Sequence, residues 1–182
     1  LRNGEPDLAL KMFKRIDKRS IYTWNSIITG TVQAGRPKVA LELFQEMLVA
    51  GNDGVIPDKI TIASVLSACA SLGALDHGNW LYSYLKRSGL EFDVVIATAL
   101  IDMYGKCGHV DKAAKVFRGM PKKDVLAWTA MISVYALHGY GKEALNLLNE
   151  MDKEGVKPNH ITFIWLLSAC AHTGLVEEGR RC

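Results

Sequence analysis

Four cysteines and five histidines are the residues of this chain with the most versatile chemistry. No two cysteines have the Cys-x-x-Cys spacing of a structural zinc site. Cys69 and Cys170 both stand in a Leu-Ser-Ala-Cys-Ala segment, which indicates an equivalent buried position in two copies of one unit. The histidines lack metal-ligand spacing too; they are His77, His109, His138, His160 and His172. We therefore expect no metal site.

Motifs of enzymatic catalysis are absent from the sequence. It contains no Gly-rich phosphate loop, no His-Glu-x-x-His, no nucleophile elbow and no zinc-deaminase signature of His-x-Glu followed by Cys-x-x-Cys. We expect no catalytic residue, no cofactor and no small-molecule substrate within these residues.

Composition describes a folded chain with a mild positive charge. Of the 182 residues, 49% are hydrophobic and 23% are charged, so a core can form. The net charge of +3 permits a nucleic-acid partner without requiring one. No run of about 18 apolar residues predicts a membrane span, and no secretory signal opens the sequence. Because the first residue is Leu1, we expect the chain to be part of a longer protein.

The elements that must position any binding residues are indicated by a series of glycines. These lie 31, 38, 35, 31 and 35 residues apart, each between two helix-like patterns: Gly4, Gly35, Gly73, Gly108, Gly139 and Gly174. A period in this range predicts an array of helical hairpins.

Each hairpin shows two apolar stripes with helical spacing. In the first complete unit, Trp24, Ile27 and Ile28 form one stripe, and Gly35 ends that helix as a left-handed cap. The complete units span residues 21–58, 59–93, 94–124 and 125–159, with partial units in 1–20 and 160–182. The glycine is always the fifteenth residue of its unit. The twentieth is always small: Ala40, Gly78, Ala113, Ala144 and Gly179.

The apolar stripes also predict the core. We expect Trp24 and Trp128 to be buried within hairpins, and Trp80 and Trp165 to serve packing as well.

Several segments resemble pentatricopeptide repeats, and more narrowly the plant PLS subclass. They are Trp24-Asn25-Ser26-Ile27-Ile28 with its closing Pro57-Asp58, Ile62-Ala63-Ser64-Val65-Leu66-Ser67-Ala68-Cys69, and Leu100-Ile101-Asp102-Met103-Tyr104-Gly105-Lys106-Cys107-Gly108. The resemblance assigns residues 1–20 to a partial S unit, 21–58 to P, 59–93 to L, 94–124 to S, 125–159 to P and 160–182 to a partial L. The first P unit has three extra residues within 52–54. The fold implied is an all-α, right-handed superhelical solenoid of helix-turn-helix repeats.

The resemblance implies recognition of single-stranded RNA at one base per repeat. In the family, the fifth and last residues of P and S units select the base. The corresponding pairs here are Asn25 with Asp58 for U, Thr98 with Asp124 for G, and Thr129 with Asn159 for A. The intervening L unit has Ala63 and Asp93, so we interpret its position as permissive. The implied site is 5′-U-N-G-A-3′.

Two further contacts follow from the resemblance. Apolar side chains at the second place of each unit would stack between bases: Tyr22, Val95 and Leu126, with Ile60 and Ile161 in the L units. Lys106, two residues before its glycine, is the predicted phosphate contact.

A simpler interpretation exists for the closing residues. Asp58, Asp93, Asp124 and Asn159 also suit helix N-caps. Capping alone does not explain why the fifth place is polar in P and S units but Ala63 and Ile164 in L units.

By resemblance, the chain would serve as a site-recognition factor for RNA processing in a chloroplast or mitochondrion, such as C-to-U editing, with organelle editing proteins as partners. The targeting transit peptide would lie outside these residues, and a deaminase-like domain could follow Cys182. The alternative is a protein-interaction scaffold like a tetratricopeptide array, whose period of about 34 does not fit the alternation of 31 and 35.

Overall fold

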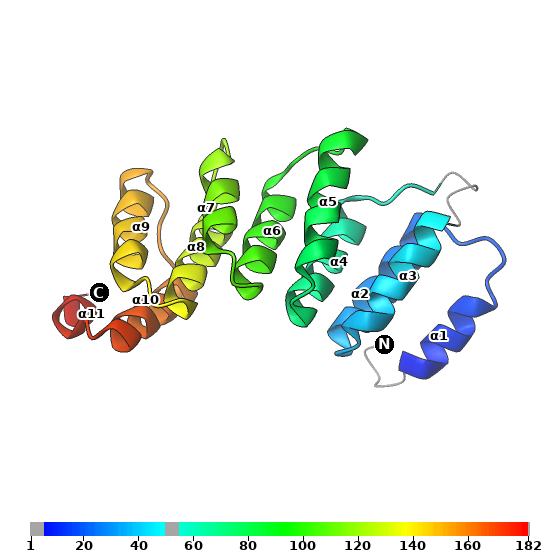
Figure 1. The fold of residues 1–182 in the computed structure, drawn as a ribbon, viewed down its shortest axis with the longest axis horizontal. Coiled ribbons are helices and arrows are strands. Elements are labelled where there is room, and N and C mark those ends of the chain that lie inside the picture. Colours follow the sequence, from blue (N-terminus) through cyan, green and yellow to red (C-terminus); the bar gives the residue numbers. More distant parts are fainter. Residues whose placement is uncertain (1–5, 50–54, 182) are drawn as a thin grey trace. The chain divides into compact units, whose positions relative to one another are not determined.

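The computed structural model describes residues 6–49 and 55–181, and the regular elements in these ranges are all α-helices (Figure 1). The helices are α1 (Pro6–Lys14), α2 (Ile21–Gln33), α3 (Pro37–Val49), α4 (Lys59–Leu72), α5 (Leu75–Ser88), α6 (Val94–Lys106), α7 (Val110–Gly119), α8 (Val125–Leu137), α9 (Gly141–Lys153), α10 (His160–Thr173) and α11 (Val176–Arg181). The predicted all-α class is confirmed for the described residues. Gly4, the insertion at 52–54 and Cys182 lie outside them.

Short polar residues begin the first helix of successive hairpins. The side chains of four of them accept backbone N–H groups in the first turns of α4, α6, α8 and α10: Asp58, Asp93, Asp124 and Asn159. At α8, for example, Asp124 Oδ1 lies 2.9 Å from Ala127 N. The capping role that the sequence left open is therefore present at all four positions.

Glycines in the left-handed region end the first helices. Five of them have φ between 63° and 80°: Gly35, Gly73, Gly108, Gly139 and Gly174. The N–H of the following residue donates to the carbonyl five residues earlier, as from His109 to Tyr104 at 2.8 Å. A Cβ added at any of these glycines would meet no atom within 4 Å. The backbone conformation, and not lack of space, therefore requires glycine at the turn.

The chain folds into two compact units, residues 1–91 and 92–182. In the first, α2 and α4 lie side by side and α3 packs against both, while α1 packs on α2 and α5 on α4 (Figure 1). Phe13 meets Trp24 edge to face, with ring centroids 4.9 Å apart. Both are buried together with Ile28 and Leu66, so the core lies between the two helical layers.

The second unit repeats this arrangement. Helices α6, α8 and α10 form one layer, α7 packs against α6 and α8, and α9 packs against α8 and α10 (Figure 1). Phe117 meets Trp128 edge to face at 5.0 Å, as Phe13 meets Trp24 in the first unit. Trp24 and Trp128 are 2% and 3% exposed, which confirms their predicted place in the core.

The small twentieth residues and two cysteines occupy the interior as predicted. Ala40, Ala113 and Ala144 are fully buried, so their size permits the close approach of the two helices in a hairpin. Cys69 and Cys170 are buried as well. Cys107 is half-buried, and this burial raises the pKa of its thiol.

Several apolar side chains on the predicted stripes are more exposed than expected. Met12 of α1, Ile16 just after α1 and Leu167 of α10 are exposed, because periodicity identifies the apolar face of a helix but not the neighbour that covers it. Trp80 is 44% exposed although it stacks on Tyr84, with centroids 5.5 Å apart. Its packing role is therefore partial. In the described ranges, no helix combines the length and the apolar character needed to cross a membrane.

Candidate nucleic-acid interface

Apolar side chains at the second place of each unit point into solvent. Their exposed fractions range from 44% to 80%: Tyr22, Ile60, Val95, Leu126 and Ile161. Each lies in the first turn of a first helix, two residues after the capping residue of that helix. Because these side chains do not pack in the core and recur at regular intervals, they are candidates for stacking against a flat ligand.

Asn25 and Asp58 are in direct contact although they are 33 positions apart in the sequence. Asn25 Nδ2 donates to Asp58 Oδ2 at 2.9 Å, while Asp58 Oδ1 accepts the N–H groups of Ile60 and Thr61, also at 2.9 Å. One carboxylate oxygen thus caps α4 and the other faces α2. Burial opposes ionisation of Asp58, but the hydrogen bonds from Thr61, Asn25 and Ile60 outweigh it and hold the pKa of the carboxyl below its ordinary value.

Thr129 and Asn159 are linked through a third residue. The Thr129 and Thr162 hydroxyl oxygens lie 2.8 Å apart, and Thr162 Oγ1 lies 3.1 Å from Asn159 Oδ1. Asn159 Oδ1 also accepts the Thr162 N–H at 3.0 Å. Because this oxygen is directed at α10, the amide nitrogen of Asn159 is the polar group left for a ligand.

Thr98 and Asp124 are arranged differently from the other two pairs. Asp124 Oδ1 caps α8 through Ala127 N, and no partner of Asp124 Oδ2 is found among the described residues. The Thr98 hydroxyl is buried and has no hydrogen-bond partner among the described residues. A buried hydroxyl without a partner is costly, so Thr98 is a candidate contact for a bound polar group.

The two units predicted to be of the L type lack a polar fifth side chain. Ala63 is half-buried, and Ile164 is 59% exposed. Asp93 nevertheless caps α6, with its Oδ1 3.0 Å from Ile96 N. Capping therefore continues where the fifth place is apolar.

Lys106, the predicted phosphate contact, forms an ion pair with Asp102. Its Nζ lies 2.8 Å from Asp102 Oδ2, one helical turn away, and both side chains are substantially exposed. Exposed pairs of this kind contribute little stability, so the ammonium can exchange its carboxylate for a phosphate at low cost.

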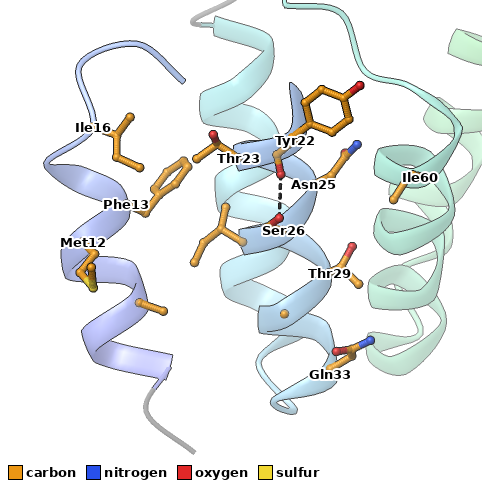
Figure 2. A pocket seen from close by; sticks show the side chains of 13 residues that line it. Met12, Phe13, Ile16, Tyr22, Thr23, Asn25, Ser26, Thr29, Gln33 and Ile60 are labelled. Carbon is orange, nitrogen blue, oxygen red and sulfur yellow. Dashed lines mark hydrogen bonds between the residues drawn. The ribbon is translucent and has the colours of Figure 1, made fainter. Parts of the chain in front are cut away.

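A groove of about 680 Å³ is lined in part by Asn25. Figure 2 shows Met12 and Phe13 of α1, with Ile16 just after that helix, on one side, and Tyr22 and Asn25 of α2 on the other. Ile60 of α4 completes the lining near Asn25 (Figure 2). The exposed side chains of Tyr22 and Ile60 therefore line the same groove as Asn25.

Sequence reasoning missed Thr61 and Thr162, the two fully buried hydroxyls that join each fifth-place residue to its closing residue. A signal was present, because Asp58-x-x-Thr61 and Asn159-x-x-Thr162 have capping-box spacing, and both boxes form. No group of three or more His, Cys, Asp or Glu residues suited to a metal ion occurs in residues 6–49 and 55–181.

Stacked helical hairpins with a polar and apolar pattern repeated along the first helices define a helical-repeat protein. The PPR repeat family model matches residues 19–71 and 123–172, and the PPR repeat model matches residues 95–125. The chain therefore belongs to the pentatricopeptide repeat family, and its predicted solenoid class is confirmed.

Relatives and solved structures agree with this assignment. Pentatricopeptide repeat-containing protein At4g38010 of Arabidopsis thaliana is 46% identical over 173 residues, which are 95% of this chain and 31% of that protein. The similar protein At1g11290, chloroplastic, of the same plant is 43% identical over 178 residues, or 98% of this chain and 22% of that protein. The chain spans less than a third of the length of either relative. The structure of PPR10 in complex with an 18-nt psaJ RNA element matches with a TM-score of 0.82 and 26% identity, covering 100% of this chain and 26% of PPR10.

Proposed function

We propose that this chain binds single-stranded RNA and reads one base per repeat, as part of a site-recognition factor for organelle RNA processing such as C-to-U editing. The observation that carries the proposal is the 2.9 Å contact between Asn25 and Asp58. It joins a fifth-place residue to the residue that closes the same unit, at the side of the exposed Tyr22. The likeness to PPR10 in complex with RNA supports the ligand class, and the relative named chloroplastic supports the organelle.

The uncommitted polar groups match the edges of the proposed bases. Asp124 Oδ2 can only accept hydrogen bonds, as the N1–H and N2–H groups of guanine require. The Asn159 amide donates, as N1 of adenine requires. Asn25 retains one N–H beyond the bond to Asp58, and a uracil carbonyl can accept it. The proposed site is therefore 5′-U-N-G-A-3′, with units 21–58, 94–124 and 125–159 as the readers.

Exposed apolar residues and one lysine would complete the contact with RNA. Tyr22, Val95 and Leu126 would stack against bases, and Lys106 would contact a phosphate. Every base has a flat face, so these contacts would add affinity without selecting the sequence. In this proposal the described residues form a binding module, and any chemistry belongs to other parts of a longer protein or to partner proteins.

Equilibrium titration of short RNAs tests the proposal. An RNA that carries U-N-G-A should bind more tightly than one in which G is replaced by A, and its affinity should fall steeply with salt because phosphate contacts release counterions. Equal binding of the two RNAs would contradict the base assignment. Absence of RNA binding even at low salt would instead favour the protein-interaction scaffold.

A further inference from the structure

Thr61 lies at the centre of the first reading pair. Its side chain is fully buried, and its hydroxyl oxygen is 2.5 Å from Asn25 Oδ1, 3.1 Å from Asp58 Oδ1 and 3.2 Å from Asp58 N. The Asp58 N–H donates to this oxygen, so the single hydroxyl proton must serve one of the other two contacts. The shorter distance assigns that proton to Asn25.

This bond fixes the orientation of the Asn25 amide. A carboxylate accepts only, so the amide nitrogen must face Asp58, and the Thr61 hydroxyl then holds the amide oxygen. Without Thr61, the amide could turn its oxygen toward a ligand after losing one bond. With Thr61, Asn25 presents a donor and not an acceptor.

Thr162 has the equivalent place in the second unit of the fold. It is fully buried, accepts the Asn159 N–H at 3.2 Å and contacts the Thr129 hydroxyl at 2.8 Å. When the Thr162 proton serves Asn159 Oδ1, the Thr129 proton must serve Thr162, and Thr129 then offers only lone pairs to a ligand. Adenine presents the N6–H group that such an acceptor requires.

The third reading pair lacks this bridge. Ala127 stands where Thr61 and Thr162 stand in the other units, three residues after the closing Asp124. Ala127 is fully buried, and the Thr98 hydroxyl has no partner among the described residues, so its proton is free to rotate. Thr98 can therefore donate or accept.

From this contrast we infer that the third residue of a repeat, where it is threonine, sets the hydrogen-bonding polarity of the fifth residue in the preceding repeat. Thr61 and Thr162 act as positioning residues that narrow the choice of base. The inference rests on the proposed function, because it concerns how sharply each pair discriminates among RNA bases. Where the threonine is present, three residues and not two determine the base, and the third comes from the following repeat.

The test measures base discrimination in this chain with four RNAs that differ only at the nucleotide assigned to Asn25 and Asp58. Thr61→Val should lower the preference for U by about 3- to 10-fold, as expected for the loss of one hydrogen bond. Thr61→Ser should keep the preference, because it retains the hydroxyl. Thr162→Val should lower the preference for A at the nucleotide assigned to Thr129 and Asn159 by a similar factor.

Thr23→Val is the matched control. Thr23 also follows a capping residue by three, and its hydroxyl lies 3.0 Å from Ser20 Oγ, without a contact to a fifth-place side chain among the described residues. Both Thr61→Val and Thr23→Val should lower the thermal midpoint, and Thr61→Val should lower it more, because the Thr61 hydroxyl is fully buried with three polar contacts and its loss leaves buried polar groups without that partner. Thr61→Val should change discrimination, and Thr23→Val should not.

Ala127→Thr supplies the opposite change. By the reasoning given for Thr129, a bridging hydroxyl at position 127 should leave Thr98 able only to accept hydrogen bonds. The variant should therefore lower the preference for G over A at the nucleotide assigned to Thr98 and Asp124 by about 3-fold or more. The site of Ala127 is fully buried, so this variant could fail to fold. In that case Thr61→Val and Thr162→Val test the inference without it. If the wild-type chain prefers U and Thr61→Val shows the same preference, the inference is wrong. If the wild-type chain shows no preference among the four RNAs, the proposed function itself is wrong.

Discussion

Asp58 binds two helices with two different oxygens: Oδ1 caps α4, and Oδ2 accepts a hydrogen bond from Asn25 on α2 at 2.9 Å. Capping and pairing with the fifth residue are therefore not competing explanations for this side chain. The same carboxylate fixes the start of one repeat and forms half of the proposed reader in the repeat before it.

Removal of the Asp58 side chain should affect both stability and discrimination. Asp58→Ala should lower the free energy of unfolding by about 1 kcal/mol, as for other lost N-caps, and should abolish the preference for U at the first nucleotide. Asp93→Ala is the control, because Asp93 caps α6 while its unit carries Ala63 at the fifth place. It should lower stability similarly and leave every base preference unchanged. Denaturant unfolding and RNA titration measure the two effects.

The lowered pKa of Asp58 predicts a dependence of stability on pH. Its folded-state pKa lies below the unfolded value of about 3.9, so the unfolded chain binds more protons between the two values. The stabilising contribution is therefore complete above about pH 5 and is lost as the pH falls through 4 toward the folded-state pKa. Asp58→Asn should show a weaker loss of unfolding free energy over this range. A constant difference between wild type and variant from pH 5 to pH 2 would contradict the assignment.

Gly139 should be intolerant of any side chain although the space around it is open. Its φ of 75° costs a residue with a Cβ about 1–2 kcal/mol, so Gly139→Ala should lower the free energy of unfolding by that amount. Gly119→Ala is the matched control, since Gly119 also has open space but lies at the end of α7 without a positive φ. This control should be neutral or slightly stabilising in the same denaturation experiment.

Leu126 should contribute affinity without specificity. It is 60% exposed in the first turn of α8, so Leu126→Ala should weaken RNA binding by about 5- to 10-fold for matched and mismatched RNA alike, with little change in stability. Leu137 lies at the opposite end of the same helix and is 53% exposed. Leu137→Ala should leave RNA affinity unchanged. An equal loss in both variants would indicate a general effect of apolar surface and not stacking.

The helices, their turns and much of the core could be predicted from the sequence because they depend on local patterns. Gly35 and its counterparts fix the turns through their backbone conformation, and the stripe spacing places Trp24 and Trp128 inside. The exposure of Met12 and Leu167 could not be predicted, since it depends on neighbouring helices.

The bridging role of Thr61 could not be predicted from local patterns either. Its bond to Asn25 joins residues 36 positions apart and exists only once α2 and α4 are packed. The spacing of Thr61 from Asp58 indicates a capping box but not this third partner.

The central claim, that the closing residue of a repeat helps to choose the base, is tested most directly at position 124. Asp124→Asn keeps an N-cap of equal quality but replaces an acceptor with an amide that can donate, as Asn159 does beside Thr129. Titration with U-N-G-A and U-N-A-A should show that wild type prefers the first RNA and Asp124→Asn prefers the second. Retention of the preference for G in a stably folded Asp124→Asn variant would contradict the account.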